Sequence, residues 1–358
     1  MKNRIAGLAV FAVVMLGMLL IGEWVIRGLF ADETVLFPRY HTDVQYGDYT
    51  LRRIRPNSRF RHASIDGSWE FVTNSQGFRN REDFSYQKPP NTFRVLSLGD
   101  SHTQGYEVRQ DHTFSAVLER YLEKHLGSAQ VLNTGVSGFS NAEALVLLEN
   151  EGLRYDPDVV VLGFFGNDLE DNIKAGLFKL NEAGDLVPAR YEHIPGVRIQ
   201  NIIYSIPGVQ WLSENSYFYS VLFNSTWDFF KNRLTQQASE QVAEYAVPQK
   251  TEYSNYEIAL AEALLERLHQ VCKDNGITLV VVDIPLLVRD GEVVSSFPDS
   301  LQEAARQHSD IFIDSKTLFS DYAGAIELQL PHGHHHISEF SHALIGVAIG
   351  EGVLRPQD

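Results

Sequence analysis

Residues 93–105 read FRVLSLGDSHTQG. The run from Phe93 to Leu98 is mostly apolar, as is typical of a strand buried on both faces of a sheet. Gly99 ends the run, and Ser101 follows in the next turn. Ligands of open α/β sheets bind at the carboxyl ends of the strands, so this position predicts a nucleophilic serine. The alternative is a structural turn capped by Asp100, because such turns are common in loops.

Downstream of this stretch, strand patterns alternate with helix patterns to the end of the chain. Start and stop signals mark the helices, such as a capping box at 140–143 and an Asn-Gly stop at 275–276. We expect strands at 131–133, 158–165, 277–282 and 311–313, and helices at 112–126, from 140 onward, and at 255–273, 302–307 and 339–350. The alternation predicts an α/β fold with a mostly parallel sheet covered on both faces.

Length and composition limit the classes of protein. The 358 residues suffice for one large α/β domain and a smaller appendage. The net charge of −16 argues against nucleic acid as a partner. The single cysteine, Cys272, falls in an apolar helical stripe and is interpreted as a core residue.

The N-terminus has the pattern of a membrane segment. Residues 5–22 are all apolar or glycine and follow Lys2 and Arg4. This run is longer than the apolar region of most cleaved signals, and no good cleavage site follows it. Residues 1–30 are therefore predicted to be an uncleaved signal anchor, with a removed signal peptide as the alternative. The two basic residues would keep the N-terminus in the cytoplasm and place the catalytic part outside it, in the periplasm or on the cell surface.

Residues 31–90 form a small section of mixed character ahead of the main domain, 91–358. Residues 69–73 alternate like a half-buried strand, and 74–77 form its closing turn. The section is rich in arginine, which either faces anionic headgroups or an anionic polymer, or forms a solvated face with local ion pairs. The arginines are Arg52, Arg53, Arg55, Arg59, Arg61, Arg79 and Arg81.

The main domain is interrupted at about 170–251 by an insertion rich in aromatic residues. An interruption of this size needs its own structure or a function, so we expect a helical cap beside the active site. Its aromatic side chains could form a platform for a sugar or acyl group, the core of the cap, or a face that rests on a membrane. They are Tyr204, Trp211, Tyr217, Phe218, Tyr219, Phe223, Trp227, Phe229 and Phe230.

Three further turns lie at predicted strand ends or before the last helix. They are NTGVSG at 133–138, GND at 166–168 and HIS at 336–338. Acyl transfer needs a nucleophile, a base within hydrogen-bond reach and donors for the oxyanion. We therefore predict Ser101 as nucleophile and His336 as base. The oxyanion donors would be the backbone N–H groups of Ser101 and Gly135 and the side-chain amide of Asn167.

These blocks, in this order, resemble the SGNH (GDSL-type) hydrolase superfamily from about residue 92 to the C-terminus, with the insertion as an interruption. The resemblance implies a flavodoxin-like three-layer α/β/α sandwich. It also implies hydrolysis or transfer of acyl esters, including acetyl groups on carbohydrates, without a metal or organic cofactor. Asp100 would then be a turn residue rather than an acid–base group.

The chain departs from the family pattern just before His336. The family usually has an aspartate two or three residues before this histidine, where the chain has His334 and Gly333. A backbone carbonyl or His334 could orient His336, a remote acid such as Asp283 or Asp314 could replace the aspartate, or activity could be low. We favour a Ser–His dyad with a carbonyl partner.

A metal site in the histidine cluster at 332–336 is disfavoured, because the cluster has no evident carboxylate or cysteine partner nearby and the resemblance to the last family block explains His336 better. The sequence predicts a membrane-anchored serine esterase that acts outside the cytoplasm on O-acetyl or short-chain esters of a glycan or other envelope component. The alternatives are an O-acyltransferase acting on such a glycan through the same site, and a binding or assembly protein of weak activity that kept the fold.

Overall fold

The computed structural model describes residues 2–38, 40–191, 196–226, 229, 253–289, 291–332 and 335–355. Its centre is a five-stranded parallel sheet with the strand order β13-β10-β7-β5-β6. These strands are β5 (Phe93–Gly99), β6 (Ala129–Asn133), β7 (Val159–Phe164), β10 (Thr278–Asp283) and β13 (Ile311–Ile313). The order reverses between β5 and β7, which is the point where doubly wound sheets bind ligands.

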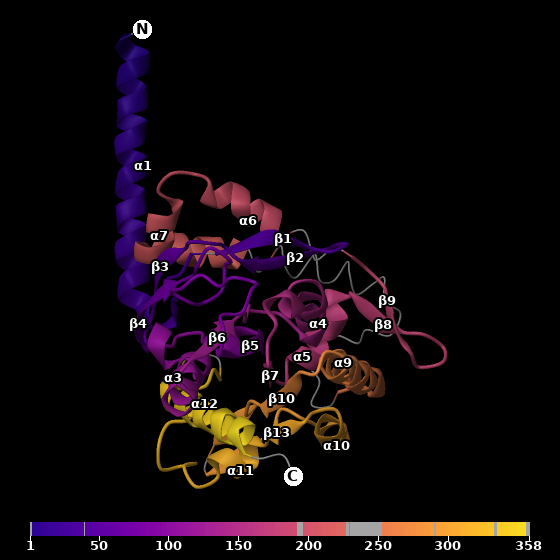
Figure 1. The fold of residues 1–358 in the computed structure, drawn as a ribbon. Coiled ribbons are helices and arrows are strands. Elements are labelled where there is room, and N and C mark those ends of the chain that lie inside the picture. Colours follow the sequence, from indigo (N-terminus) through magenta and orange to yellow (C-terminus); the bar gives the residue numbers. More distant parts are fainter. Residues whose placement is uncertain are drawn as a thin grey trace.

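Helices cover both faces of the sheet, as Figure 1 shows. One face carries α4 (Asn141–Asn150), α5 (Asp168–Ala175), α9 (Asn255–Asp274) and α10 (Asp299–Gln307), and the other carries α3 (Phe114–Leu126), α11 (Ser315–Phe319) and α12 (Glu339–Leu354). Adjacent strand residues enter opposite cores: Leu96 lies in the core under α4 and α9, and Val95 in the core under α3 and α12. This alternation confirms the predicted three-layer α/β/α architecture.

Most predicted elements lie within a few residues of their expected bounds, and the differences have local causes. The helix expected from residue 112 begins at Phe114, because a 3-10 turn at Gln110–His112 precedes it and the Thr113 side chain caps it. The helix expected from residue 302 begins earlier, directly after Pro298. The capping box at Ser140 is present. Cys272 is fully buried, as expected of a core residue.

The section before the sheet contains two antiparallel hairpins, of which the sequence predicted one strand. The hairpins are β1 (His41–Tyr46) with β2 (Tyr49–Ile54), and β3 (Arg59–Ser64) with β4 (Gly67–Val72). β4 corresponds to the strand expected at 69–73. Apolar side chains of both hairpins join the core under α4, so this section packs directly on the main domain.

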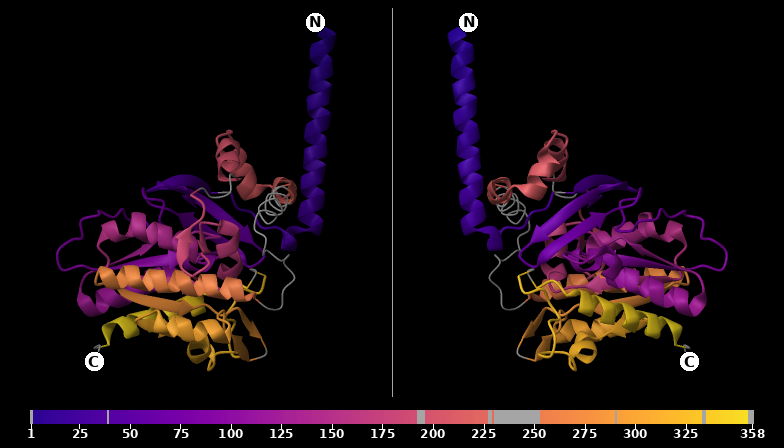
Figure 2. Two further views of the ribbon diagram at one scale, coloured as in Figure 1. Left: turned by 90° about the vertical axis from the view of Figure 1, so that its right-hand side faces the viewer. Right: turned by 90° about the vertical axis from the view of Figure 1, so that its left-hand side faces the viewer.

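The helix α1 (Lys2–Leu29) projects away from the rest of the molecule (Figure 2). Its segment Arg4–Leu29 has a mean hydropathy of 2.6, and it is long and apolar enough to cross a membrane. Its apolar side chains are exposed along almost the whole helix.

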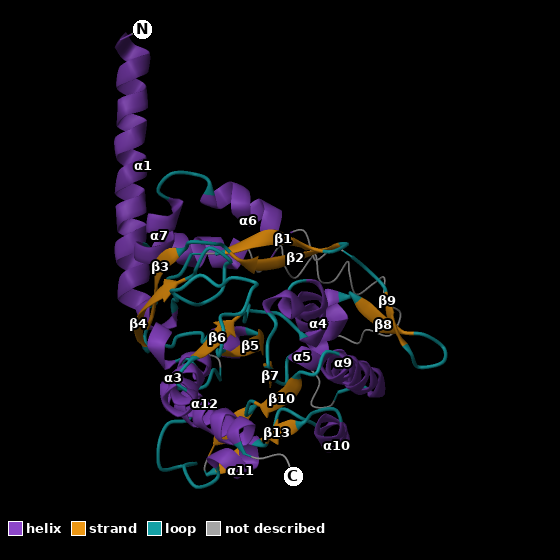
Figure 3. Cartoon of the chain, in the orientation of Figure 1, coloured by secondary structure: helices purple, strands orange, loops and turns teal. Residues whose placement is uncertain are grey.

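The insertion leaves the main domain after α5, which packs against α4 and α9. Its described elements are the hairpin β8 (Phe178–Leu180) and β9 (Leu186–Pro188), and the helices α6 (Gly196–Tyr204) and α7 (Val209–Asn215). α6 packs against β1 and α7 against β3, so this part of the insertion lies on the N-terminal hairpins (Figure 3). Trp227 and Phe230, expected among the aromatic residues of the cap, lie outside the described residues.

Two short strands between β10 and α10 were not expected. They form a hairpin of β11 (Leu287–Arg289) and β12 (Glu292–Val294). Three residues per strand are too few for a periodic pattern to distinguish them from a loop.

Candidate active site

Ser101 lies in the sharp turn between β5 and the short helix α2 (Ser101–Gln104). The Asp100 carboxylate accepts a hydrogen bond from the His102 backbone N–H at 2.8 Å and so caps α2. Gly99 has a φ of +144°, and a Cβ there would lie 2.3 Å from the Thr103 Oγ1. Glycine is therefore required at this turn, which exposes the Ser101 side chain at the carboxyl edge of the sheet.

His336 reaches Ser101 from a loop 235 residues further along the chain. Its Nε2 lies 2.8 Å from the Ser101 Oγ. The preceding His335 has a φ of +65°, a conformation that histidine adopts more readily than most residues. The Gln329 side chain donates to the His335 carbonyl at 2.9 Å, and Ser338 caps α12 directly after the loop.

The imidazole of His336 is held between two aromatic rings. The ring of Tyr106 lies 4.4 Å from it, centroid to centroid, with an interplanar angle of 29°. The ring of His102 lies 4.6 Å from it at 26°, and Phe165 packs behind His102 at 4.1 Å. Burial lowers the pKa of His102 well below its ordinary value. His102 is therefore neutral at neutral pH and offers His336 a ring face without a competing charge.

Gly135 lies close to the turn that carries Ser101. A Cβ at Gly135 would lie 2.3 Å from the backbone nitrogen of Gln104, so only glycine allows this contact. The Asn133 side chain links the same two segments: its Nδ2 donates to the Thr103 carbonyl at 3.0 Å, and its Oδ1 accepts from the Gly135 N–H at 3.2 Å. Gln104 adds a further link, since its Oε1 accepts from the Ser137 N–H at 2.6 Å.

Asn167 follows β7 at the start of α5. Its Nδ2 donates to an Asp171 carboxylate oxygen at 3.0 Å, which orients the amide and leaves the second hydrogen of the same nitrogen outside this bond. Its neighbour Asp168 is buried and accepts from the Phe165 N–H and the Asn141 side chain, each at 3.2 Å. Asp168 therefore acts as a structural brace behind the turn.

The buried carboxyl of Asp100 lies close enough to Asp168 for the two to interact electrostatically. Burial raises the pKa of Asp100 to about 7. Burial and the nearby Asp100 raise the pKa of Asp168 well above its ordinary value. Asp100 accepts its short hydrogen bond from the His102 backbone N–H, at 2.8 Å, and the Ser101 hydroxyl lies 3.5 Å from its other carboxylate oxygen. The short backbone bond fits the expected role of Asp100 as a turn residue.

Asp283, Asp314 and His334 were the side chains that the sequence analysis offered as partners to orient His336. Asp283 accepts hydrogen bonds from the hydroxyl groups of Ser295, at 2.7 Å, and Ser315. Asp314 caps α11 and pairs with Arg306 at 2.8 Å. Their described contacts are thus structural and lie away from His336. His334 lies outside the described residues.

The N-terminal hairpins support the site through two contacts that the sequence analysis missed. Asp66, in the β3–β4 turn, accepts from the His332 backbone N–H at 3.0 Å and contacts the His332 Nδ1 at 2.8 Å. His62 of β3 packs edge-on against Tyr106 at 4.6 Å. The aromatic residue Tyr106, five positions after Ser101, was the one visible signal, and nothing local in the sequence connects Asp66 to the histidine loop.

The arginine-rich section makes mostly intramolecular contacts. Arg79 is buried and donates to the carbonyls of Gln104, Gly105 and Val108, which fixes the chain after α2. Arg55 donates to Asn201 of α6, and Arg61 to Asn215 and the Glu214 carbonyl. Arg52 binds the Gly138 carbonyl, Arg59 pairs with Glu70, and Arg81 pairs with Asp111. These contacts favour local pairing over an anionic polymer as the role of the section.

A family model described as the GDSL-like Lipase/Acylhydrolase family matches residues 97–344. This match includes both Ser101 and His336. Among curated proteins, no match was found.

Solved structures with a similar fold include three esterases or lipases. A lipase/acylhydrolase from Enterococcus faecalis is 17% identical, with a TM-score of 0.40 and coverage of 74% of this chain and 99% of that one. An acetylxylan esterase from Geobacillus stearothermophilus is 13% identical, with a TM-score of 0.41 and coverage of 74% and 95%. A two-domain esterase active on acetylated mannans is 12% identical, with a TM-score of 0.41. The match covers 73% of this chain and 49% of that esterase, about half its length.

Proposed function

Because the chain belongs to the GDSL-like lipase/acylhydrolase family and is a hydrolase of ester bonds, we propose that Ser101 is its nucleophile and His336 its general base. The observation that carries this proposal is the 2.8 Å contact between the Ser101 Oγ and the His336 Nε2. A base at this distance can take the hydroxyl proton as the oxygen attacks an ester carbonyl.

The reaction then follows from the neighbouring groups. The Ser101 Oγ bonds to the carbonyl carbon, and the carbonyl oxygen gains negative charge. The Ser101 N–H and the second hydrogen of the Asn167 amide stabilise this oxyanion. The Gly135 N–H joins them by exchanging its 3.2 Å hydrogen bond to the Asn133 Oδ1 for one to the oxyanion. His336 returns its proton to the departing alcohol, which leaves an acyl-serine. A water molecule, deprotonated by His336, releases the carboxylic acid and restores Ser101.

The rings of Tyr106 and His102, which with the His336 imidazole form a ring stack, perform part of the role that an aspartate has in a triad. An aspartate holds the histidine in one orientation and stabilises its charged form. Here Tyr106 and His102 enclose the imidazole from its two faces and restrict its rotation. A tyrosine face also attracts a cationic ring, so Tyr106 favours the imidazolium that forms during attack.

The substrate we propose is an O-acetyl or other short-chain ester of a glycan or related envelope component, outside the cytoplasm. The apolar helix α1 supports a membrane anchor, and the basic residues Lys2 and Arg4 at its N-terminal end support an outward-facing catalytic domain. A hollow of about 660 Å³, lined in part by Ala325 and His335, adjoins the histidine loop and falls within the size range of ligand sites. Ser101 and His336 are not among its lining residues, so we propose that this hollow receives a part of the alcohol distant from the reacting ester.

Labelling with a fluorophosphonate probe tests the catalytic residues. The full chain in detergent should be labelled, and Ser101→Ala and His336→Ala should abolish labelling and hydrolysis of p-nitrophenyl acetate. Ser85→Ala, which removes an exposed hydroxyl elsewhere, is the matched control and should behave as wild type. Undiminished hydrolysis by Ser101→Ala would refute the proposal.

Acetate release from acetylated xylan and mannan oligosaccharides tests the substrate. Ala325→Trp should raise KM for these oligosaccharides and leave p-nitrophenyl acetate hydrolysis unchanged, because the indole fills the hollow. Equal KM values of wild type and Ala325→Trp for these oligosaccharides would show that the hollow does not bind the substrate. Acetylated product formed with an added acceptor sugar, in place of free acetate, would identify a transferase.

A further inference from the structure

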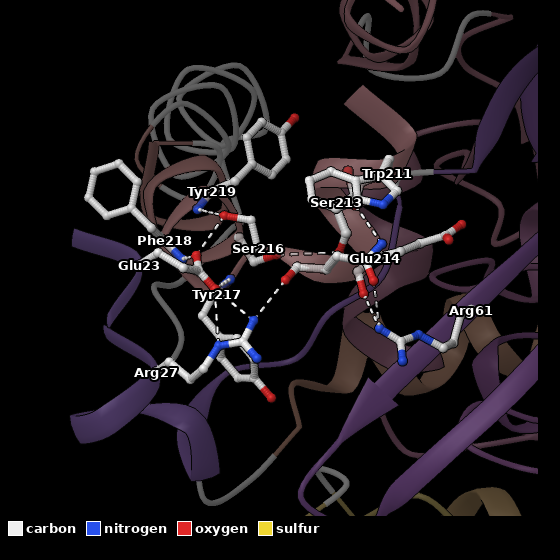
Figure 4. A network of polar contacts seen from close by, with 12 residues as sticks. Glu23, Arg27, Arg61, Trp211, Ser213, Glu214, Ser216, Tyr217, Phe218 and Tyr219 are labelled. Atoms are coloured by element: carbon white, nitrogen blue, oxygen red, sulfur yellow. Dashed lines mark hydrogen bonds and ion pairs between the residues drawn. The ribbon is translucent and has the colours of Figure 1, made fainter. Parts of the chain in front are cut away.

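The last turns of α1 are joined firmly to the insertion (Figure 4). The Glu23 carboxylate accepts from the Ser216 hydroxyl at 2.8 Å and from the backbone N–H groups of Tyr217 and Phe218 at 3.2 and 3.0 Å. It thereby caps the helical segment 217–226. Arg27 pairs with Glu23 at 2.9 Å and donates to the Asn215 carbonyl at 3.0 Å. These hydrogen bonds and this ion pair fix the end of α1 to the insertion. We call the contact of Glu23 and Arg27 with residues 215–218 the corner.

This corner defines where the insertion lies relative to a bilayer that α1 spans. Helix length places the boundary, because a hydrocarbon core of about 30 Å takes about 20 residues at a rise of 1.5 Å each. Counted from Arg4, the apolar stretch ends at Gly22, and Glu23 is the first charged side chain after it. The ring of Phe218 packs on Gly22, where a Cβ would lie 2.9 Å from it. The segment 216–218 therefore lies at the depth of the membrane boundary.

Large apolar side chains of the insertion are exposed beside this corner. Ile206 is 53% exposed, Trp211 of α7 is 63% exposed and Leu222 of the segment 217–226 is 57% exposed. Val209 and Ser213, two positions before and after Trp211 in α7, are buried, so Trp211 lies on the side of the helix that faces away from the protein. The other side of the two helices is bonded to the hairpins: Asn201 of α6 accepts from Arg55 at 3.0 Å, and Gln210 of α7 donates to the Arg59 carbonyl at 3.1 Å. An exposed apolar face on a helix whose other side packs on the protein is the pattern of a helix that lies in a membrane interface.

We infer that α6, α7 and the segment 217–226 form an interfacial platform that rests on the lipid surface around α1, with Ile206, Trp211 and Leu222 among the headgroups. The inference rests on the proposed membrane anchor. The occupant is a bilayer because the exposed face continues directly from a helix of membrane-spanning length. Since α7 also packs against β3, which contacts Tyr106 through His62, the platform holds the catalytic site at a set orientation to the membrane.

Depth-dependent fluorescence quenching tests the platform. The full chain is reconstituted into phosphatidylcholine vesicles, and single introduced cysteines are labelled with an environment-sensitive dye; the native Cys272 is fully buried and does not react. The labelled positions are Ile206→Cys and Leu222→Cys on the platform and Val13→Cys in α1. Leu126→Cys, at a residue that is 44% exposed at the end of α3, is the matched control.

Lipids with a spin label near the headgroup should quench the two platform dyes severalfold more than the Leu126 dye. Lipids labelled near the chain end should quench the Val13 dye. Unquenched platform dyes together with a quenched Val13 dye would overturn the platform and leave the anchor in place. An unquenched Val13 dye would refute the anchor, and the platform with it. Hydrolysis of p-nitrophenyl acetate by each variant shows that it is folded, and that activity tests the catalytic proposal separately.

Discussion

The ring stack around His336 leads to a quantitative prediction for Tyr106→Leu. This substitution keeps an apolar side chain but removes the ring that lies 4.4 Å from the imidazole. An aromatic pair contributes about 0.5–1.5 kcal/mol beyond the burial of its area. If that energy holds His336 in the orientation that reaches Ser101, kcat should fall by about 2- to 13-fold.

The split between kcat and KM distinguishes positioning from a general loss of structure. The assay is the initial rate of p-nitrophenyl acetate hydrolysis over a range of substrate concentrations, with the unfolding midpoint measured in parallel. Tyr106→Leu should lower kcat and leave KM close to that of wild type. Tyr106→Phe, which keeps the ring and removes the hydroxyl, is the matched control and should retain kcat within about twofold.

Two results would refute the reasoning. The first is a wild-type kcat for Tyr106→Leu, which would mean that His336 is held by other groups. The second is an equal loss in Tyr106→Phe and Tyr106→Leu, which would assign the effect to the hydroxyl and not to the ring.

Three further predictions concern the supports of the site. Gly135→Ala should lower kcat by at least about tenfold, because its Cβ would lie 2.3 Å from the backbone of α2 and displace the nucleophile turn; a wild-type rate would show that the turn can yield freely. Asp66→Ala removes two hydrogen bonds to His332, and at about 0.5 kcal/mol each it should lower kcat about fivefold; an unchanged kcat would exclude this clamp. Burial lowers the pKa of His342 to about 3. Between pH 6.5 and 3 the unfolded chain therefore binds a proton at His342 that the folded chain does not bind. The free energy of unfolding thus falls as the pH falls, and this group lowers it by about 2 kcal/mol between pH 7 and pH 5. In urea unfolding at pH 7 and pH 5, His342→Gln should lose less stability on acidification than wild type, and an equal loss would contradict the assignment.

The sheet and its helices were predictable because their signals are local. The run from Phe93 to Leu98 and the capping box at Ser140 each lie within a few residues of the element they define. The strands that were not predicted are short, as for β11 and β12, or carry residues of mixed character, as for β1 and β2. In such segments, contacts with the rest of the fold decide the structure more than propensity does.

The sequence by itself determined which residues could meet in the site. In a parallel sheet all carboxyl ends share one edge, so Ser101, Gly135 and Asn167 were expected at that edge once their strands were recognised. The tertiary structure alone decided what holds His336, because Tyr106, His102 and the clamp from Asp66 to His332 bring together segments up to 266 residues apart. It also decided that Arg55 and Arg61 bond the hairpins to the insertion. Periodicity and turn chemistry report on neighbours along the chain, whereas these contacts arise from packing between distant segments that no local pattern encodes.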